Sequence, residues 1–421
     1  MIDTKTNITQ TILDSLTTAG NKISFMPDAA VVDAIRYVEE NGIPNNKHED
    51  YKYCNLEAVF RKEFKTIGNK FNTISKVDSH KLKDCVNIVV VNGEYNESLS
   101  DKTSEVKINT LANSATEIKN HITKYANVNS DALIALNTAF CSGGLFISIS
   151  GIIKKPIHII NITSAKENAV INPRQLIILE KSAEATIVES FVSESNSAKV
   201  FQNHLSEVVL GENSKLNSYR LQNEDEHSYQ MNTVQVSVNR YANYTTNTFT
   251  FNGAVVRNNL NVVLASDLCE SHLNGLFISS GTKLIDNHTL VDHQKPNCQS
   301  NELYKGIAKD KSTGVFNGKI YVRKDAQKTN AYQSSKNILL SEDATINTKP
   351  QLEIYADDVK CSHGTSTGKV DEAALFYLKS RGIGDEKARK LLLQAFAQEV
   401  IDKIEVEELR ERVIDLFEKA L

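Results

Sequence analysis

A thiol and an imidazole lie two residues apart near the end of the chain, at Cys361 and His363. They follow a run with the alternation of a strand, in which Leu352 and Ile354 fall on one face. Residues i and i+2 of an extended segment project from the same face, so the sulfur and a ring nitrogen can lie side by side. On spacing alone, a buried cysteine and a hydrogen-bonded histidine are the commoner explanation.

Soft thiolate together with imidazole suits zinc, copper or iron–sulfur chemistry. A closed metal site normally needs four ligands, whereas Cys361 and His363 supply two. If this pair binds a metal, we therefore expect a partner to supply the remaining ligands.

A second dense set of donors lies upstream and comprises Asp286, His288, Asp292, His293 and Cys298. Its spacing matches no standard zinc motif, and Pro296 prevents a helix from spanning it. We therefore favour core packing and turn hydrogen bonds for these residues over metal or sulfur handling.

The segment Gly364-Thr-Ser-Thr-Gly368-Lys369-Val370 superficially resembles a phosphate-binding loop. Three residues separate its glycines where four are required, and Val370 stands where Ser or Thr would bind magnesium. We expect a turn leading into the C-terminal helix, and no nucleotide bound by this chain. The sequence has no Gly-x-Ser-x-Gly elbow either, so nothing in it supports an enzyme.

The bulk properties favour a cytoplasmic protein with two or three domains. The chain has 421 residues, a net charge of −4 and no basic stripe that would indicate nucleic acid or a membrane surface. No apolar run approaches a membrane span, and Met1–Asn7 lacks a secretory apolar segment. The six cysteines have no regular spacing, which predicts free thiols, with Cys54, Cys85, Cys141 and Cys269 buried.

Three regions differ in their sequence pattern. Residues 1–125 read as helical and mixed, with a helix between Pro27 and Gly42 and a strand at 86–91 before an Asn-Gly turn. Residues 126–364 carry short strands, and turn residues recur near positions 182, 213, 241, 266 and 343, at first intervals of roughly 25 to 31 residues. This pattern leaves a parallel β-helix and a β-sandwich equally open.

Residues 365–421 predict three amphipathic helices. Asp371 can cap a helix that ends before Gly382, a second runs from Glu386 to about Lys403, and a third spans 407–420. We expect these helices to form a small cap that shields the last coil.

Several of these segments resemble the SufB/SufD family of iron–sulfur cluster assembly proteins. ADDVKCSHG at 356–364, followed by DEAALFYLKSRGI at 371–383, is similar to the family's C-terminal signature. Cys-Ser-His-Gly there resembles the SufD branch, whereas SufB carries a Glu-His-Glu-Ala type of sequence. Segments at 41–44, 48–56, 136–140, 155–157 and 286–306 also resemble SufD, so the likeness extends from about Met26 onward.

The resemblance implies a right-handed parallel β-helix and a non-enzymatic subunit that pairs with SufB, or with itself. It implies docking of SufC, an ABC-type ATPase, on residues 371–421. It also implies that His363, and less securely Cys361, contacts a transient iron–sulfur cluster or iron at the subunit interface. The alternatives are a SufB-like primary scaffold and a β-helix carbohydrate-binding protein.

Overall fold

A computed structural model describes the fold over residues 8–19, 25–64, 67–68, 70–74, 77–141, 143–194 and 198–421. Its helices are α1 (Ile8–Ala19), α2 (Asp28–Asn41), α3 (Leu56–Glu63), α4 (Ala115–Ile118), α5 (Ala132–Ala139), α6 (Glu372–Ser380), α7 (Asp385–Ile401) and α8 (Glu407–Ala420), with 3-10 turns at Glu49–Tyr51, Asp78–His80, Glu97–Leu99 and Ala112–Ser114. Its strands are β1 (Val86–Val91), β2 (Glu94–Tyr95), β3 (Lys107–Thr110), β4 (Gly143–Ile149), β5 (Ile157–Thr163), β6 (Ala169–Ile171), β7 (Pro173–Leu179), β8 (Glu184–Ser193), β9 (Val200–Leu210), β10 (Lys215–Asn223), β11 (Ser228–Val238), β12 (Asn243–Asn252), β13 (Val255–Leu264), β14 (Glu270–Ser279), β15 (Leu284–His293), β16 (Gln299–Ala308), β17 (Thr313–Val322), β18 (Thr329–Leu339), β19 (Thr345–Ile354) and β20 (Val359–Gly368).

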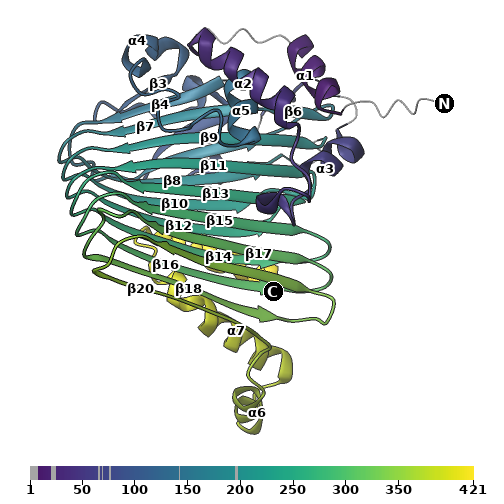
Figure 1. Cartoon of the computed structure of the whole chain (residues 1–421). Coiled ribbons are helices and arrows are strands. Elements are labelled where there is room, and N and C mark those ends of the chain that lie inside the picture. Colours follow the sequence, from purple (N-terminus) through teal and green to yellow (C-terminus); the bar gives the residue numbers. More distant parts are fainter. Residues whose placement is uncertain are drawn as a thin grey trace.

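The strands form a two-sheet parallel solenoid (Figure 1). Sheet 1 has the order β2-β1-β5-β8-β10-β12-β14-β16-β18-β20, and sheet 2 has the order β19-β17-β15-β13-β11-β9-β7-β4-β3. Successive strands from β8 onward alternate between the sheets, so each pair of strands is one coil stacked on the last. The predicted parallel β-helix is confirmed, and the β-sandwich alternative is wrong.

The corners of the coils explain the repeat in the sequence. Ser182, Asn213, Tyr241 and Leu268 all have positive φ angles, between 57° and 60°, at corresponding turns. The Ser182 N–H donates to the Glu212 carbonyl at 2.8 Å, and the Asn213 N–H donates to the Arg240 carbonyl at 2.8 Å. Ser182 and Asn213 therefore each gain a hydrogen bond to the next coil, which helps to hold the stack in register.

The solenoid interior changes character along its length. One inward-facing column of sheet 1, here the His363 column, runs in register through Val86, Ile157, Ile187, Ser218, Thr246, Leu273, Glu302, Gln333 and His363. It is apolar at the N-terminal end and polar at the C-terminal end. The last coils therefore hold polar groups where the first coils hold a hydrocarbon core.

The N-terminal helices cover the outer face of sheet 2. Residues of α1, α2, α3 and α5 pack on that face, where the Phe60 and Phe201 rings lie 4.6 Å apart. The predicted helix between Pro27 and Gly42 is confirmed as α2, and Gly42 ends it with φ 73°. Val86–Val91 is confirmed as a strand, β1, which joins sheet 1 beside β5.

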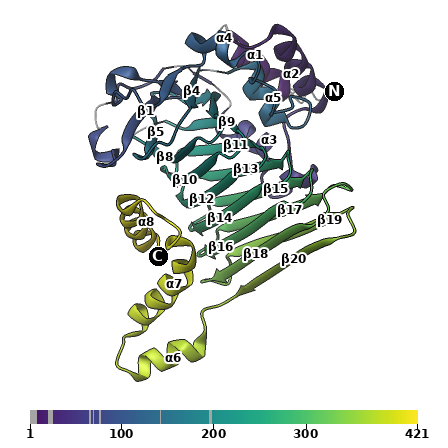
Figure 2. The same ribbon diagram turned by 90° about the vertical axis from the view of Figure 1, so that its left-hand side faces the viewer.

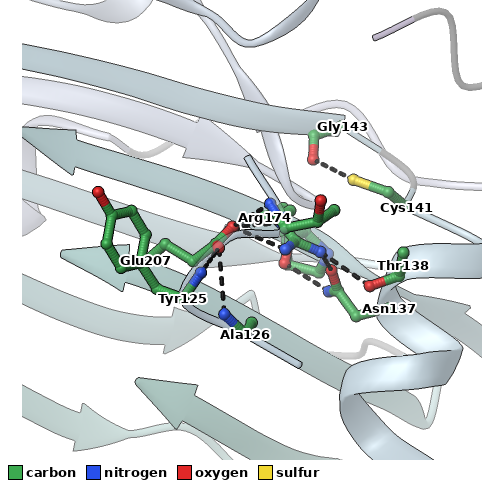
Figure 3. A network of polar contacts seen from close by, with 10 residues as sticks. Tyr125, Ala126, Asn137, Thr138, Cys141, Gly143, Arg174 and Glu207 are labelled. Carbon is green, nitrogen blue, oxygen red and sulfur yellow. Dashed lines mark hydrogen bonds and ion pairs between the residues drawn. The ribbon is translucent and has the colours of Figure 1, made fainter. Parts of the chain in front are cut away.

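A buried ion pair fastens the N-terminal region to sheet 2 (Figure 3). Arg174 on β7 and Glu207 on β9 lie 2.6 Å apart with fully buried side chains. Glu207 also accepts the backbone N–H groups of Tyr125 and Ala126, and Arg174 donates to Thr138 on α5. The Glu207 carboxylate therefore binds both Arg174 on β7 and the backbone of the segment that leads into α5.

The C-terminal helices lie against the outer face of sheet 1, beside the coils (Figure 2). Phe417 of α8 packs edge-on against Phe251 of β12 at 6.4 Å, within a cluster that includes Phe249. The expectation that these helices shield the last coil is therefore wrong. Outward-facing aromatic side chains on β12 provide an apolar surface on sheet 1, so the helices bury that surface and leave the final strands uncovered.

The helix boundaries themselves agree with the sequence. Asp371 accepts the N–H groups of Ala373 and Ala374 and caps α6, while Gly382 follows that helix with φ 84°. No helix within the described residues combines the length and the apolar character needed to cross a membrane.

Candidate functional site at the open end of the solenoid

The last coil leaves the edges of both sheets open. Strand β20 pairs only with β18, and β19 pairs only with β17, within the residues that the structure describes. Nearly all of β20 is exposed. Such an edge presents unpaired backbone donors and acceptors, which is a template for adding another strand.

Strand β20 extends further than the sequence indicated. Gly364 to Gly368 continue the strand in register beside Ser334 to Ile338, so the expected turn at this position is wrong. The two glycines lie at an exposed edge, where a Cβ would meet nothing within 4 Å, so no close approach requires them.

Cys361 and His363 share the inward-facing side of β20, as strand alternation requires. Cys361 is half-buried and packs against a small apolar cluster that includes Val322 and Ala331. This burial raises the pKa of the Cys361 thiol. His363 is exposed because no further coil covers it. The thiol therefore faces the core, whereas the imidazole is available to a molecule that docks on the open end.

Polar side chains lie directly behind His363. Its in-register neighbour is Gln333 on β18, which is buried, and the next residue of the His363 column is Glu302 on β16. Gln333 Nε2 donates to Glu302 Oε2 at 3.2 Å, and Thr289 Oγ1 donates to the same oxygen at 2.7 Å. Burial raises the pKa of Glu302 to about 7.

Sequence reasoning missed Gln333 and Glu302. The signal that could have found them is the coil period of about 31 residues, which places Glu302, Gln333 and His363 at intervals of 31 and 30 residues on one column. The repeat was visible in the sequence, but its register was not followed as far as the last coils.

The second group of donors does not converge. His293 faces the interior and contacts Ser300 Oγ at 2.9 Å, whereas His288 faces outward and contacts Asp286 at 2.8 Å. Asp292 pairs with Arg323 on the outer surface. Among the residues that the structure describes, no three His, Cys, Asp or Glu side chains are grouped to hold a metal ion. Packing and hydrogen bonding, the interpretation favoured from sequence, account for these residues.

The other cysteines are internal, as predicted. Cys54, Cys85, Cys141 and Cys269 are free and buried, and so is Cys298. Burial raises the pKa of the Cys54 thiol to about 12 and of Cys85 and Cys141 to about 11. Of the six cysteines, Cys361 alone is not fully buried. Cys361 is therefore the thiol most accessible to a reactant at the surface.

A second exposed feature lies on the C-terminal helices. Phe376 and Tyr377 of α6 are 74% and 57% exposed, and α6 extends away from the solenoid (Figure 2). A cleft of about 520 Å³ separates the end of β18 from α7 and α8, lined by Leu340 and Leu393 among others. Helix α6 therefore presents two aromatic side chains to solvent, and the cleft beside α7 and α8 is lined by both apolar and charged residues.

Comparison with known protein families matches nearly the whole chain. The model of the SufBD core domain of SUF system FeS cluster assembly matches residues 161–396, and the model of the SufBD protein N-terminal region matches residues 21–159. The chain belongs to the SufBD family. The core match begins inside β5 and ends in α7, so it covers most of the solenoid, including β20.

Two of the similar relatives carry the name SufD. The iron–sulfur cluster assembly protein SufD of Escherichia coli is 31% identical over 89% of this chain and 88% of its own length. A SufBD family protein of Synechocystis is 29% identical over 88% of this chain and 86% of its own length. SufD of Bacillus subtilis is 26% identical over 69% of this chain and 67% of its own length. The chain is SufD-like by homology.

Proposed function

We propose that this chain is the SufD-like, non-enzymatic subunit of an iron–sulfur cluster assembly scaffold. Its open end pairs with a SufB-like subunit, or with a second copy, and His363 contributes a nitrogen ligand to the cluster being built there. The nascent cluster is the cargo of the complex. The observation that carries this proposal is an exposed imidazole on the free edge strand of a SufBD family solenoid.

The position of His363 suits an incomplete site that a partner completes. One imidazole and one half-buried thiol cannot close an iron or cluster site that needs about four ligands. A second strand that docks along β20 can present its own donors opposite His363, since the strand-pairing groups of this edge are free. Cys361 is the weaker candidate because its sulfur packs against apolar side chains of its own chain.

The ATPase partner in this proposal is an ABC-type, SufC-like protein that binds residues 371–421. Helix α7 is tied to the strands next to the open end, because Glu399 pairs with Lys305 on β16 at 2.7 Å and with Lys336 on β18 at 3.6 Å. Strand β18 is the direct neighbour of β20. Movement of the helices on ATP binding can therefore reach the interface, provided that its open and closed states differ in contacts.

The test replaces His363 by Ala in the assembled complex with the SufB-like and SufC-like proteins. Anaerobic reconstitution with ferrous iron and a sulfide source is followed by visible absorption and by iron and sulfide content. We expect cluster content per complex to fall several-fold in H363A, because one ligand is lost while the edge strand persists.

The matched control is K360A, which changes an exposed residue on the opposite face of the same strand. Size-exclusion chromatography establishes that both variants assemble. Undiminished cluster content in a fully assembled H363A complex would remove the ligand role from this residue.

A further inference from the structure

Gln333 places a buried oxygen without a partner directly behind His363. Its Nε2 donates to Glu302, whereas its Oε1 accepts no hydrogen bond from any residue that the structure describes and is inaccessible to solvent. Buried acceptors of this kind are rare in folded proteins and call for an explanation. The inward-facing neighbour on the open side of Gln333 is His363.

The orientation of the Gln333 amide is fixed from the other side. Glu302 Oε2 accepts from both Thr289 and Gln333, so reversing the amide would bring two acceptor oxygens together. Gly318 on the facing sheet leaves the space that the amide occupies, and a Cβ there would overlap Nε2. The Gln333 Nε2 group therefore donates to Glu302, and Gln333 Oε1 is left as the acceptor that can receive another hydrogen bond.

The structure contains no hydrogen bond between the Gln333 and His363 side chains, but the strand spacing brings the exposed imidazole within reach of Oε1 once its ring rotates toward β18. Parallel neighbours in register lie about 4.8 Å apart, and both side chains leave the inward face of sheet 1. A histidine that binds metal through one nitrogen usually donates its other ring N–H to a carbonyl, carboxylate or water. Gln333 Oε1 is an acceptor of that type at this position.

We propose that Gln333 is a positioning residue for His363. Its Oε1 accepts one ring N–H of His363, which fixes the tautomer and directs the other, unprotonated nitrogen toward the subunit interface. The role of that unprotonated nitrogen as a cluster ligand rests on the proposed function. The hydrogen bond itself concerns the isolated chain and can be measured without iron, sulfide or partner.

The experiment measures the His363 tautomer by nitrogen NMR on protein labelled at histidine, with the signal assigned by its loss in H363A. The pH is about 8.5, where most imidazoles are neutral. In Q333M, which keeps the length of the side chain and removes the acceptor, we expect the ratio of the two tautomers to change roughly three- to tenfold. The control S335A alters the next inward residue of β18 and should match the wild type.

A reciprocal variant guards against misfolding of Q333M. His363 is exposed, so H363F should leave the solenoid intact, and the side-chain carbonyl carbon of Gln333 should shift as it loses its donor. Coinciding tautomer ratios in wild type and Q333M, or an unmoved Gln333 carbonyl in H363F, would overturn the inference. Either result leaves the H363A cluster experiment unaffected, so the two proposals fail separately.

Discussion

Glu302 shows how one residue of the interior ties stability to pH. Its carboxyl is enclosed in the solenoid and carries a pKa of about 7, raised by burial from the ordinary value of 4.5. Between these two pH values the unfolded chain releases the proton while the folded chain keeps it. The unfolded state then binds fewer protons, so this group lowers stability as pH rises from about 4.5 to 7.

We therefore expect E302Q to remove that pH dependence. Gln can still accept from Thr289 and Gln333 but carries no ionisable group. Relative to wild type, the free energy of unfolding of E302Q should rise between pH 4.5 and 8 by about 2–4 kcal/mol. Urea unfolding across this pH range measures the difference. The exposed substitution E226Q serves as the control, and a constant offset between E302Q and wild type at every pH would contradict the expectation.

At the scale of elements, the Arg174–Glu207 pair determines how α5 and residues 123–126 attach to sheet 2. The R174M variant leaves a fully buried carboxylate without its counter-ion, so we expect a loss of about 3–5 kcal/mol in the free energy of unfolding. The double variant R174M/E207Q should recover part of this loss. It removes the unpaired charge, while the amide oxygen still accepts the N–H of Tyr125.

Chemical denaturation of both variants checks this expectation. A double variant less stable than R174M would show that the acceptor role of Glu207 toward the backbone outweighs its charge. An R174M variant as stable as wild type would show that the buried pair contributes nothing net.

Local sequence signals predicted where these elements begin and end, but they did not predict how the elements pack. Asp371 and Gly382 bound α6 through capping and left-handed backbone preferences, which act within a few residues and are legible in sequence. The placement of α7 and α8 on sheet 1 depends on Phe249 and Phe251, which lie more than 130 residues upstream. The strand at Gly364–Gly368 is imposed by pairing with β18, against the turn preference of glycine.

The candidate site divides in the same way. Strand periodicity was enough to place Cys361 and His363 on one face, but not to show that Cys361 turns into a small apolar cluster. The Gln333 and Glu302 side chains required the register of successive coils, a long-range property.

At the scale of the whole molecule, the C-terminal helices and the free edge strand of sheet 1 serve separate partners in our proposal. The ATPase is expected to bind α6, and the sister subunit is expected to bind β20. Replacing Phe376 and Tyr377 by Ser should weaken binding of the ATPase at least tenfold, because exposed aromatic residues often dominate such interfaces. Titration calorimetry with the purified ATPase measures this loss.

Because both side chains are largely exposed, the melting temperature of the double variant should equal that of the wild type. Replacing Tyr53, an aromatic residue 41% exposed in the N-terminal region, by Ser is the matched control. Full affinity in the F376S/Y377S variant would place the ATPase elsewhere on the chain.

The unequal ends of the solenoid also limit how large an assembly can grow. At the N-terminal end the sheets finish in the short antiparallel strands β2 and β3, two and four residues long, whereas β19 and β20 each offer ten residues. A solenoid that can pair with a neighbour at only one end has no free end left once it has formed a dimer. Open filaments, the usual hazard of stacked sheets, are thereby replaced by closed pairs.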